Sequence, residues 1–340
     1  MIKIGLAESI NRPQADDAPV EYLDRSLEVV RAARDAGFHY VRAGHHWLAG
    51  FLDPFAVFAR AVPESGDMEL HTGVFLLPQH NPFDIAERVA TLDLLSKGRF
   101  RFGVGLGYRE LEFQAAGMPK SQRVGRLVES IEIMRRLWSG EELTYQGRYF
   151  QITRGQSTFR PVQRPGPKIY IGAMHPNAVR RAGSIGDGWM ALAAYTRENF
   201  REHLGIYRQG RREANKAGDG DILLNRQVHM AATMGHAMEE AKTYMPDIWN
   251  SEFYRGGGLQ QDLGDAFKFE LSWEELASER AVIGTPDDVV AGLQWHIDEF
   301  ALTHLSLSMR PPGTSHEAYL ALIRQVGLEV IPNLCPASSG

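Results

Sequence analysis

The sequence predicts an α/β fold, a (β/α)8 TIM barrel with insertions, and three observations lead to that prediction. Strand-like and helix-like segments alternate along nearly the whole chain, which indicates a parallel sheet covered by helices. There are about eight strand–helix units, the number of a closed barrel. No Gly-x-Gly-x-x-Gly pattern follows the first strand, which disfavours the rival fold, an open doubly wound sheet. A chain of 340 residues is long enough to form such a barrel.

Eight segments carry the alternation or the short apolar run that is typical of a strand. They are residues 2–6, 40–45, 70–77, 100–104, 168–173, 188–193, 222–230 and 304–309. Residues 143–152, with Gly147 at their centre, are predicted to form a hairpin inserted before the next strand.

The helices between these strands are marked by apolar spacing and by end signals. Asn81 followed by Pro82 predicts a helix start, because asparagine caps free N–H groups and proline suits the first helical position. Apolar residues at helical spacing predict a long amphipathic helix over 124–138. Thr285 and Asp288 predict another capped start.

The stretch from 93 to 107 joins a helix to a strand and ends in glycines. Gly98 follows the predicted helix at the position where glycine commonly ends a helix in the left-handed conformation. Residues 100–104 then alternate as in a strand. Glycines at 103, 105 and 107 leave the strand end without side chains on one face. We therefore expect a flat ligand to lie close to this backbone.

The chain is predicted to be one domain, residues 1–335, with a short frayed tail at 336–340. Residues 235–280 have little clean periodicity and contain three consecutive glycines at 256–258. A long irregular stretch inside a compact domain is usually a functional lid or a disordered loop. We predict an inserted mobile loop there.

Composition excludes several classes of protein. The net charge of −5, with both signs interspersed, argues against a nucleic-acid-binding surface. No apolar run approaches the roughly 18 residues of a membrane span. Cys335 is the only cysteine, so neither a disulfide framework nor a thiol-rich metal site is expected. Without a signal-peptide pattern, we expect a cytoplasmic protein.

Several motifs resemble, in order, those of one family. They are Gly44-His45-His46-Trp47, His71-Thr72-Gly73-Val74, Ser96-Lys97-Gly98-Arg99-Phe100, Tyr108-Arg109-Glu110, Ile169-Tyr170-Ile171-Gly172-Ala173, Gly186-Asp187-Gly188-Trp189 and Ile283-Gly284-Thr285-Pro286. The ordered set is similar to the bacterial luciferase-like family of flavin-dependent monooxygenases. The resemblance implies the same barrel and a mobile active-site loop after the seventh strand.

His45 is the catalytic residue that the resemblance implies, since it matches the first histidine of the family's Glu-His-His motif. A histidine that titrates near neutrality can move protons at a reacting flavin. The alternative is a hydrogen-bonded structural histidine, and for His46 this alternative is favoured. Gly44 stands where the family usually has an acidic residue, which weakens the match.

The resemblance also implies a cofactor-binding segment at Thr72, Gly73 and Val74. Family members have a non-proline cis peptide under the flavin ring, and the match falls between Gly73 and Val74. From the sequence alone, Gly73 fits a β-bulge equally well.

Two further regions are predicted to bind the flavin phosphate. Arg123 matches the family's phosphate-binding arginine, and a guanidinium meets phosphate oxygens in pairs; the alternative is a solvated arginine. The second region is the backbone around Ala173, Met174 and His175, before a helix whose N-terminus attracts anions.

Trp47 and Tyr108 are predicted to line the substrate pocket, although aromatic residues at such positions are more often core. No metal site is predicted, because the histidines lack a His-x-His pair or a His-Glu-x-x-His helix.

The resemblance implies a flavin-dependent monooxygenase that oxidises a small organic substrate with reduced FMN and O2 through a C4a-peroxyflavin. Reduced FMN would come from a separate flavin reductase, and a homodimer is expected. One alternative keeps the fold but uses a 5-deazaflavin coenzyme for hydride transfer. The others are a non-catalytic flavin-binding protein and, less favoured, a metal-dependent hydrolase.

Overall fold

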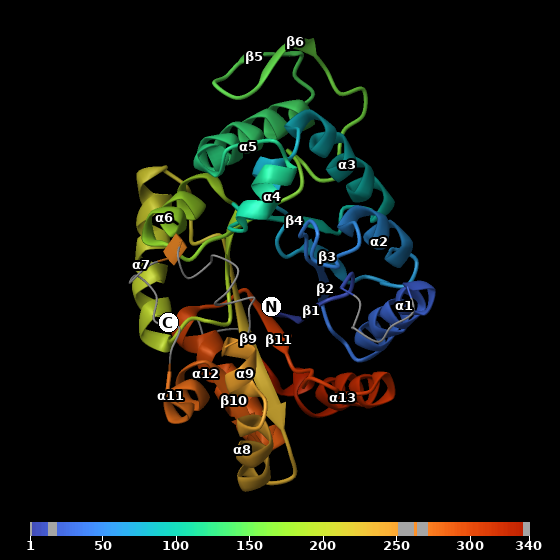
Figure 1. The fold of residues 1–340 in the computed structure, drawn as a ribbon, viewed down its shortest axis with the longest axis vertical. Coiled ribbons are helices and arrows are strands. Elements are labelled where there is room, and N and C mark those ends of the chain that lie inside the picture. Colours follow the sequence, from blue (N-terminus) through green and yellow to red (C-terminus); the bar gives the residue numbers. More distant parts are fainter. Residues whose placement is uncertain (1, 13–18, 251–261, 264–270, 336–340) are drawn as a thin grey trace.

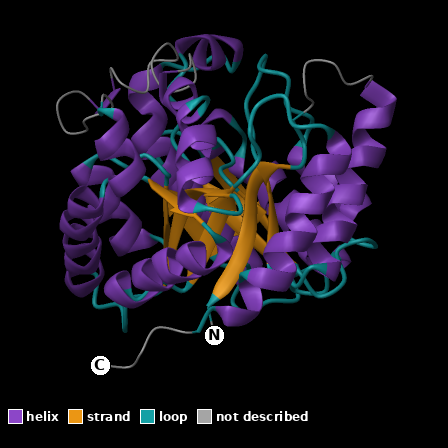
Figure 2. Cartoon of the chain, turned by 90° about the horizontal axis from the view of Figure 1, so that it is seen from below, coloured by secondary structure: helices purple, strands orange, loops and turns teal. Residues whose placement is uncertain are grey.

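The computed structural model describes residues 2–12, 19–250, 262–263 and 271–335. Eight parallel strands close into a barrel in the order β1, β2, β3, β4, β7, β8, β9, β11 and back to β1. Helices surround the barrel on the outside, and the strands lie enclosed at its centre (Figures 1 and 2). The predicted (β/α)8 barrel is confirmed.

The barrel strands are β1 Lys3–Ser9, β2 Tyr40–Ala43, β3 Glu69–Thr72, β4 Phe100–Val104, β7 Ile169–Gly172, β8 Gly188–Ala191, β9 Asp221–Met230 and β11 His304–Ser308. The helices around them are α1 Pro19–Asp35, α2 Pro54–Ala61, α3 Pro82–Leu95, α5 Arg123–Ser139, α6 Pro176–Ile185, α7 Arg197–Glu213, α12 Pro286–Phe300 and α13 His316–Glu329.

The insertions carry the shorter elements. They are α4 Glu110–Ala115, the hairpin β5 Leu143–Gln146 with β6 Gln151–Gly155, α8 Met234–Lys242, α9 Met245–Asn250, α11 Trp273–Glu279 and β10 Ala281–Gly284, with 3-10 turns η1 Leu77–Gln79, η2 Lys120–Gln122 and η4 Ile331–Asn333. The predicted hairpin is confirmed and extends to Gly155.

The predicted helix ends are also confirmed. Asn81 accepts a hydrogen bond from the backbone N–H of Phe83 at 2.9 Å, and Pro82 occupies the first turn of α3. Thr285 and Asp288 form a reciprocal capping box at the start of α12. Gly98 adopts a φ of 84°, as a left-handed helix end requires.

The structure differs from the sequence expectations in one strand, covers the predicted loop only in part, and adds one strand. The strand predicted over 70–77 ends at Thr72, and the chain then turns into η1. The irregular segment 235–280 contains α8, α9 and α11, and residues 251–261 and 264–270 of the predicted loop lie outside the described residues, as does the predicted tail 336–340. β10, which pairs in parallel with the C-terminal part of β9, was not predicted.

The glycines at the end of β4 serve packing. A Cβ on Gly103 would lie 1.9 Å from the carbonyl oxygen of Thr72, and one on Gly105 would lie 2.6 Å from Val74. The bare face predicted as a ligand surface is therefore filled by the neighbouring strand end. Within the described ranges, no helix combines the length and the apolar character needed to cross a membrane.

Candidate functional site at the mouth of the barrel

The candidate site lies at the C-terminal ends of β2, β3 and β4, the end of such barrels where active sites are built. The peptide bond between Gly73 and Val74, directly after β3, is cis. This confirms the cis peptide and excludes the bulge interpretation. Thr72 is fully buried, and its hydroxyl donates to the carbonyl oxygen of Gly103 at 2.8 Å, which ties the end of β3 to β4.

Arg42 supports this peptide from inside the barrel, and no motif singles it out in the sequence. Its Nη2 donates to the carbonyl oxygen of Gly73 at 2.9 Å, and its side chain is buried. A Cβ on Gly73 would lie 2.3 Å from the Arg42 Nε. Gly73 is therefore required for the close approach of a positive charge to the cis peptide.

His45 follows β2 and is buried beside aromatic side chains. Its Nε2 accepts a hydrogen bond from the indole Nε1 of Trp47 at 3.0 Å, and its ring stacks on Phe75 at 4.4 Å between centroids. Burial, followed by repulsion from His80 and His46, lowers the pKa of His45 to about 3. The expectation that His45 titrates near neutrality is wrong, because its imidazole is kept from water and lacks a nearby carboxylate among its hydrogen-bond partners.

His46 is held by a hydrogen bond to a carboxylate that no sequence motif singles out. Its Nδ1 lies 2.8 Å from the Oε1 of Glu112 on α4. The same oxygen accepts from the backbone N–H of Trp47 at 3.1 Å and from Arg109 at 3.2 Å. Glu112 is fully buried and joins the loop after β2 to α4, which favours the structural interpretation of His46.

Trp47 and Tyr108, the predicted pocket residues, both lie at this mouth and are half-buried. The Tyr108 ring meets His46 edge-on at 5.7 Å, and Trp47 contacts His45. Both side chains therefore face the same histidine pair from two different loops.

Arg123 begins α5 and belongs to a cationic group beside the mouth. Its Nη1 lies 2.8 Å from the carboxylate of Asp262, and Lys120 contacts the same carboxylate at 2.9 Å. Arg181 of α6 is close enough for the Arg123 charge to add to burial in lowering the Arg181 pKa. Lys120 and Arg123 already bind one anionic group, the Asp262 carboxylate. The same donors therefore suit a phosphate group.

The start of α6 is less free than predicted. The side chain of His175 accepts from the backbone N–H of Asn177 at 3.3 Å and so caps the helix. The carbonyl oxygens of Ala173 and Met174 accept from Trp189 at 2.9 Å and from Tyr195 at 3.2 Å. These bonds fix the segment from one side, while one helix donor that could bind phosphate already has a partner.

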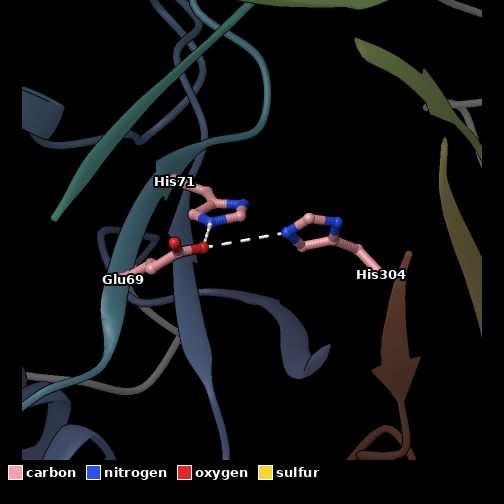
Figure 3. Close-up of side chains that lie close together, drawn as sticks. All are labelled: Glu69, His71 and His304. Atoms are coloured by element: carbon pink, nitrogen blue, oxygen red, sulfur yellow. Dashed lines mark hydrogen bonds and ion pairs between the residues drawn. The ribbon is translucent and has the colours of Figure 1, made fainter. Parts of the chain in front are cut away.

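A second polar cluster lies at the opposite, N-terminal end of the strands. The Oε2 of Glu69 lies 2.9 Å from the Nε2 of His71 and 3.8 Å from the Nε2 of His304 (Figure 3). The other oxygen of Glu69 pairs with Lys3 at 2.7 Å and with Arg101. We call these five residues the floor cluster.

The floor cluster contains the convergent histidine and carboxylate set that sequence spacing did not predict. His304 comes from β11, far along the chain, so no local motif announces it. The two cations on Glu69 already compensate its charge, and a divalent cation beside them would be repelled. Burial lowers the pKa of His71 to about 3, which keeps it neutral as a donor to Glu69. The arrangement favours a hydrogen-bonded barrel floor over a metal centre.

Comparison with known proteins identifies the family. The model of the luciferase-like monooxygenase family matches residues 2–299. This chain belongs to the luciferase-like monooxygenase family. Like the dehydrogenases and monooxygenases among its relatives, this luciferase-like protein is an oxidoreductase, and a flavin-type cofactor goes with the family.

Relatives of this luciferase-like chain include proteins named for coenzyme F420. The F420-dependent glucose-6-phosphate dehydrogenase of Amycolatopsis mediterranei (strain U-32) is 28% identical over 347 residues, which are 98% of this chain and 99% of that protein. The F420-dependent hydroxymycolic acid dehydrogenase of Mycobacterium tuberculosis (strain ATCC 25618 / H37Rv) is 27% identical over 311 residues, 87% of this chain and 82% of that one.

Solved structures share the fold of this luciferase-like chain. The monooxygenase RslO1 from Streptomyces bottropensis superposes with a TM-score of 0.82 at 23% identity, over 97% of this chain and 99% of that one. The oxygenating constituent of 3,6-diketocamphane monooxygenase from Pseudomonas putida, in complex with FMN, gives 0.80 at 17% identity, over 99% and 100%.

Proposed function

We propose that this protein is an F420-dependent oxidoreductase that transfers hydride between a hydroxyl-bearing organic substrate and the deazaflavin. The two relatives described above that match 98% and 87% of the chain are named for that coenzyme, which favours the deazaflavin alternative over a reduced-FMN monooxygenase. The state of His45 is the single structural observation that carries the proposal. A base that removes a hydroxyl proton needs a free lone pair near the substrate, and Nε2 of His45 already accepts an N–H at the mouth of the barrel, from Trp47 at 3.0 Å.

The residues at the mouth fit a deazaflavin of this kind. Arg123 and Lys120 would hold its phosphate in place of the Asp262 carboxylate, with which they now pair. The cis peptide at Gly73 and Val74, braced by Arg42, would support the ring. When bound, the deazaflavin supplies a carbon centre that accepts or returns hydride.

The protein's own task is then to orient the hydroxyl and take its proton. The Nε2 of His45 is the acceptor atom, and at present it accepts from the indole of Trp47. A substrate hydroxyl would take the place of this indole N–H, so Trp47 must turn away when substrate binds. Phe75, stacked on His45, keeps water from the imidazole and preserves its low pKa.

The test is a pair of anaerobic binding titrations of the purified protein, one with F420 and one with reduced FMN. The proposal expects tighter binding of F420 and reduction of F420 by a panel of alcohols without oxygen consumption. Preferential binding of reduced FMN followed by substrate-dependent oxygen uptake would overturn it.

A second candidate, the reduced-FMN monooxygenase, is favoured by one feature. His45 is buried against the aromatic rings of Phe75 and Trp47, which exclude water from it. Oxygen-activating flavin chemistry needs such exclusion of water. Only this candidate requires the predicted flavin reductase. The homodimer stays a prediction under either function, and analytical ultracentrifugation would test it. Tight flavin retention without turnover of any substrate would favour the non-catalytic binding protein.

A further inference from the structure

Three arginine side chains and one histidine gather around β9, outside the barrel wall. They are Arg197, Arg226, Arg280 and His296, and we call them the outer basic cluster. Leu223 of β9 packs inside the barrel with Tyr170 and Met190. Successive strand residues alternate between faces, so Arg226 points away from the interior and toward the helices.

Strand pairing brings two of these arginines side by side. β9 and β10 are parallel, with Gln227 opposite Ala281. Arg226 directly precedes Gln227, and Arg280 directly precedes Ala281. The two arginines therefore occupy neighbouring positions on adjacent segments of the sheet. Both side chains are fully buried.

Helix α12 forms the wall that faces them. A Cβ on Gly292 would lie 2.6 Å from Val282, which lies two residues beyond Arg280 and on the same face of β10. His296 lies one turn after Gly292, and its Nδ1 bonds the carbonyl oxygen of Gly292 at 2.7 Å. The Nε2 of His296 is buried and has no hydrogen-bond partner among the described residues.

Arg197, at the start of α7, connects the cluster to the surface. Its guanidinium lies 4.4 Å from the ring centroid of Trp295, which is 37% exposed. Its backbone N–H donates to Glu279 at 2.9 Å, and this carboxylate is the acid that lowers the net positive charge of the cluster.

Arg226 has too few partners for a buried cation. In the described part of the chain, its Nε and Nη2 have no hydrogen-bond acceptor, and its Nη1 reaches only the carbonyl oxygen of Asn225 at 3.3 Å. An arginine side chain does not lose its proton in proteins, so it cannot escape this position by becoming neutral. A buried unpaired charge is strongly unfavourable, and a bound counter-ion would relieve it.

We propose that the outer basic cluster binds a phosphate-type oxyanion between Arg226 and Arg280, as inorganic phosphate or as the phosphate group of a small metabolite. The planar forks of two guanidinium groups match tetrahedral oxyanions, and a bound anion would supply the hydrogen-bond acceptors that Nε and Nη2 of Arg226 lack. The site is separate from the Arg123 group, because Arg226 lies on β9, whereas Arg123 begins α5, which follows β4, and β7 and β8 lie between these two strands.

The experiment follows thermal unfolding of the full-length protein with increasing inorganic phosphate, against sodium chloride at matched ionic strength. We expect a saturable rise in Tm of about 2–5 °C that chloride does not produce. The variant Arg226→Met should lose this rise while being at least as stable as wild type without phosphate, since the unpaired charge is gone. Arg226→Lys should weaken calorimetric binding by about tenfold, because one fork is lost.

Two matched variants complete the design. Arg201→Gln on exposed α7 and Arg123→Gln at the cofactor site should both respond like wild type. A wild-type response no larger than with chloride, an unchanged response in Arg226→Met, or a loss confined to Arg123→Gln would each overturn the proposal. Repeating the titration with glycerol phosphate separates the two sources: binding of both anions indicates a metabolite site, and binding of phosphate alone indicates a free-ion site.

Discussion

The two ends of the barrel both contain buried histidines beside charged groups, yet they differ in how completely those groups are paired. At the floor, Glu69 holds Lys3, Arg101 and His71 at once. At the mouth, His45 has the indole of Trp47 as its strong partner and a longer contact of 3.4 Å to a backbone N–H.

This difference distinguishes a structural cluster from a reactive one. Floor partners come from β1, β3, β4 and β11, and replacing Glu69, which joins them, would leave Arg101 and Lys3 without their counter-charge. Mouth partners come from loops and can be exchanged for a ligand. Proximity of histidine and carboxylate is therefore a poor guide to function, whereas an exchangeable partner is a better one.

The largest expected effect concerns His45. Replacement by Ala should lower kcat/KM by about 10²–10⁴-fold, because general-base catalysis is lost, with unchanged cofactor affinity. Steady-state kinetics and a cofactor titration would measure this. His46→Gln serves as the matched control and should retain most activity; full turnover by the His45→Ala enzyme would remove His45 from the mechanism.

The floor should show the reverse pattern, a loss of stability without loss of catalysis. Glu69→Gln leaves Lys3 and Arg101 without their buried counter-charge, so the free energy of unfolding should fall by about 3–5 kcal/mol. Urea denaturation followed by circular dichroism measures this. Activity per folded molecule at low temperature should stay near wild type, and a selective drop in kcat would contradict the structural interpretation.

Acid should lower the free energy of unfolding through buried histidines at both ends of the barrel, because folding lowers the pKa of these histidines. His71 and His45 have folded pKa values of about 3 against 6.5 for the free group, so the unfolded chain binds their protons first. Stability should therefore be complete above pH 6.5 and fall as the pH drops toward 3, by about 1.4 kcal/mol per pH unit for each histidine.

Replacing His71 by Asn should reduce the dependence of unfolding free energy on pH by the contribution of one histidine, about 1.4 kcal/mol per pH unit. The measurement is urea unfolding at pH steps between 4 and 7.5. An identical slope in the variant and the wild type would mean that His71 is not the group that resists protonation.

The smallest effect concerns Asp262. Asp262→Asn should tighten cofactor binding by about 2–5-fold, because Arg123 and Lys120 would no longer give up partly exposed ion pairs worth roughly 0.2–1 kcal/mol. Fluorescence titration would detect this, and Arg123→Gln should change affinity in the opposite direction. Weaker binding by the Asp262→Asn protein would instead make Asp262 part of the cofactor site.

The sequence predicted features that depend on local chemistry. Alternating strands and helices, the capped starts at Asn81 and Thr285, and the left-handed Gly98 all follow from spacing and from backbone preference within a few residues. The cis peptide between Gly73 and Val74 was reached through resemblance, and the structure agrees with it.

Features that depend on long-range contacts were missed or misjudged. Glu112 was not singled out, because only the fold of α4 turns its carboxylate to His46. The pKa of His45 depends on burial by Phe75 and Trp47, which a sequence does not display. The role of Asp262 depends on a contact across more than a hundred residues.

By itself the sequence determined the barrel, because the period of its apolar residues and the chemistry of its turns specify each strand and helix locally. Tertiary structure alone decided which histidine is isolated and which is compensated, since charge and burial depend on neighbours that closure of the barrel brings together. His304 reaches Glu69, and Arg280 comes to lie beside Arg226, only because strands far apart in the chain become adjacent in the sheet.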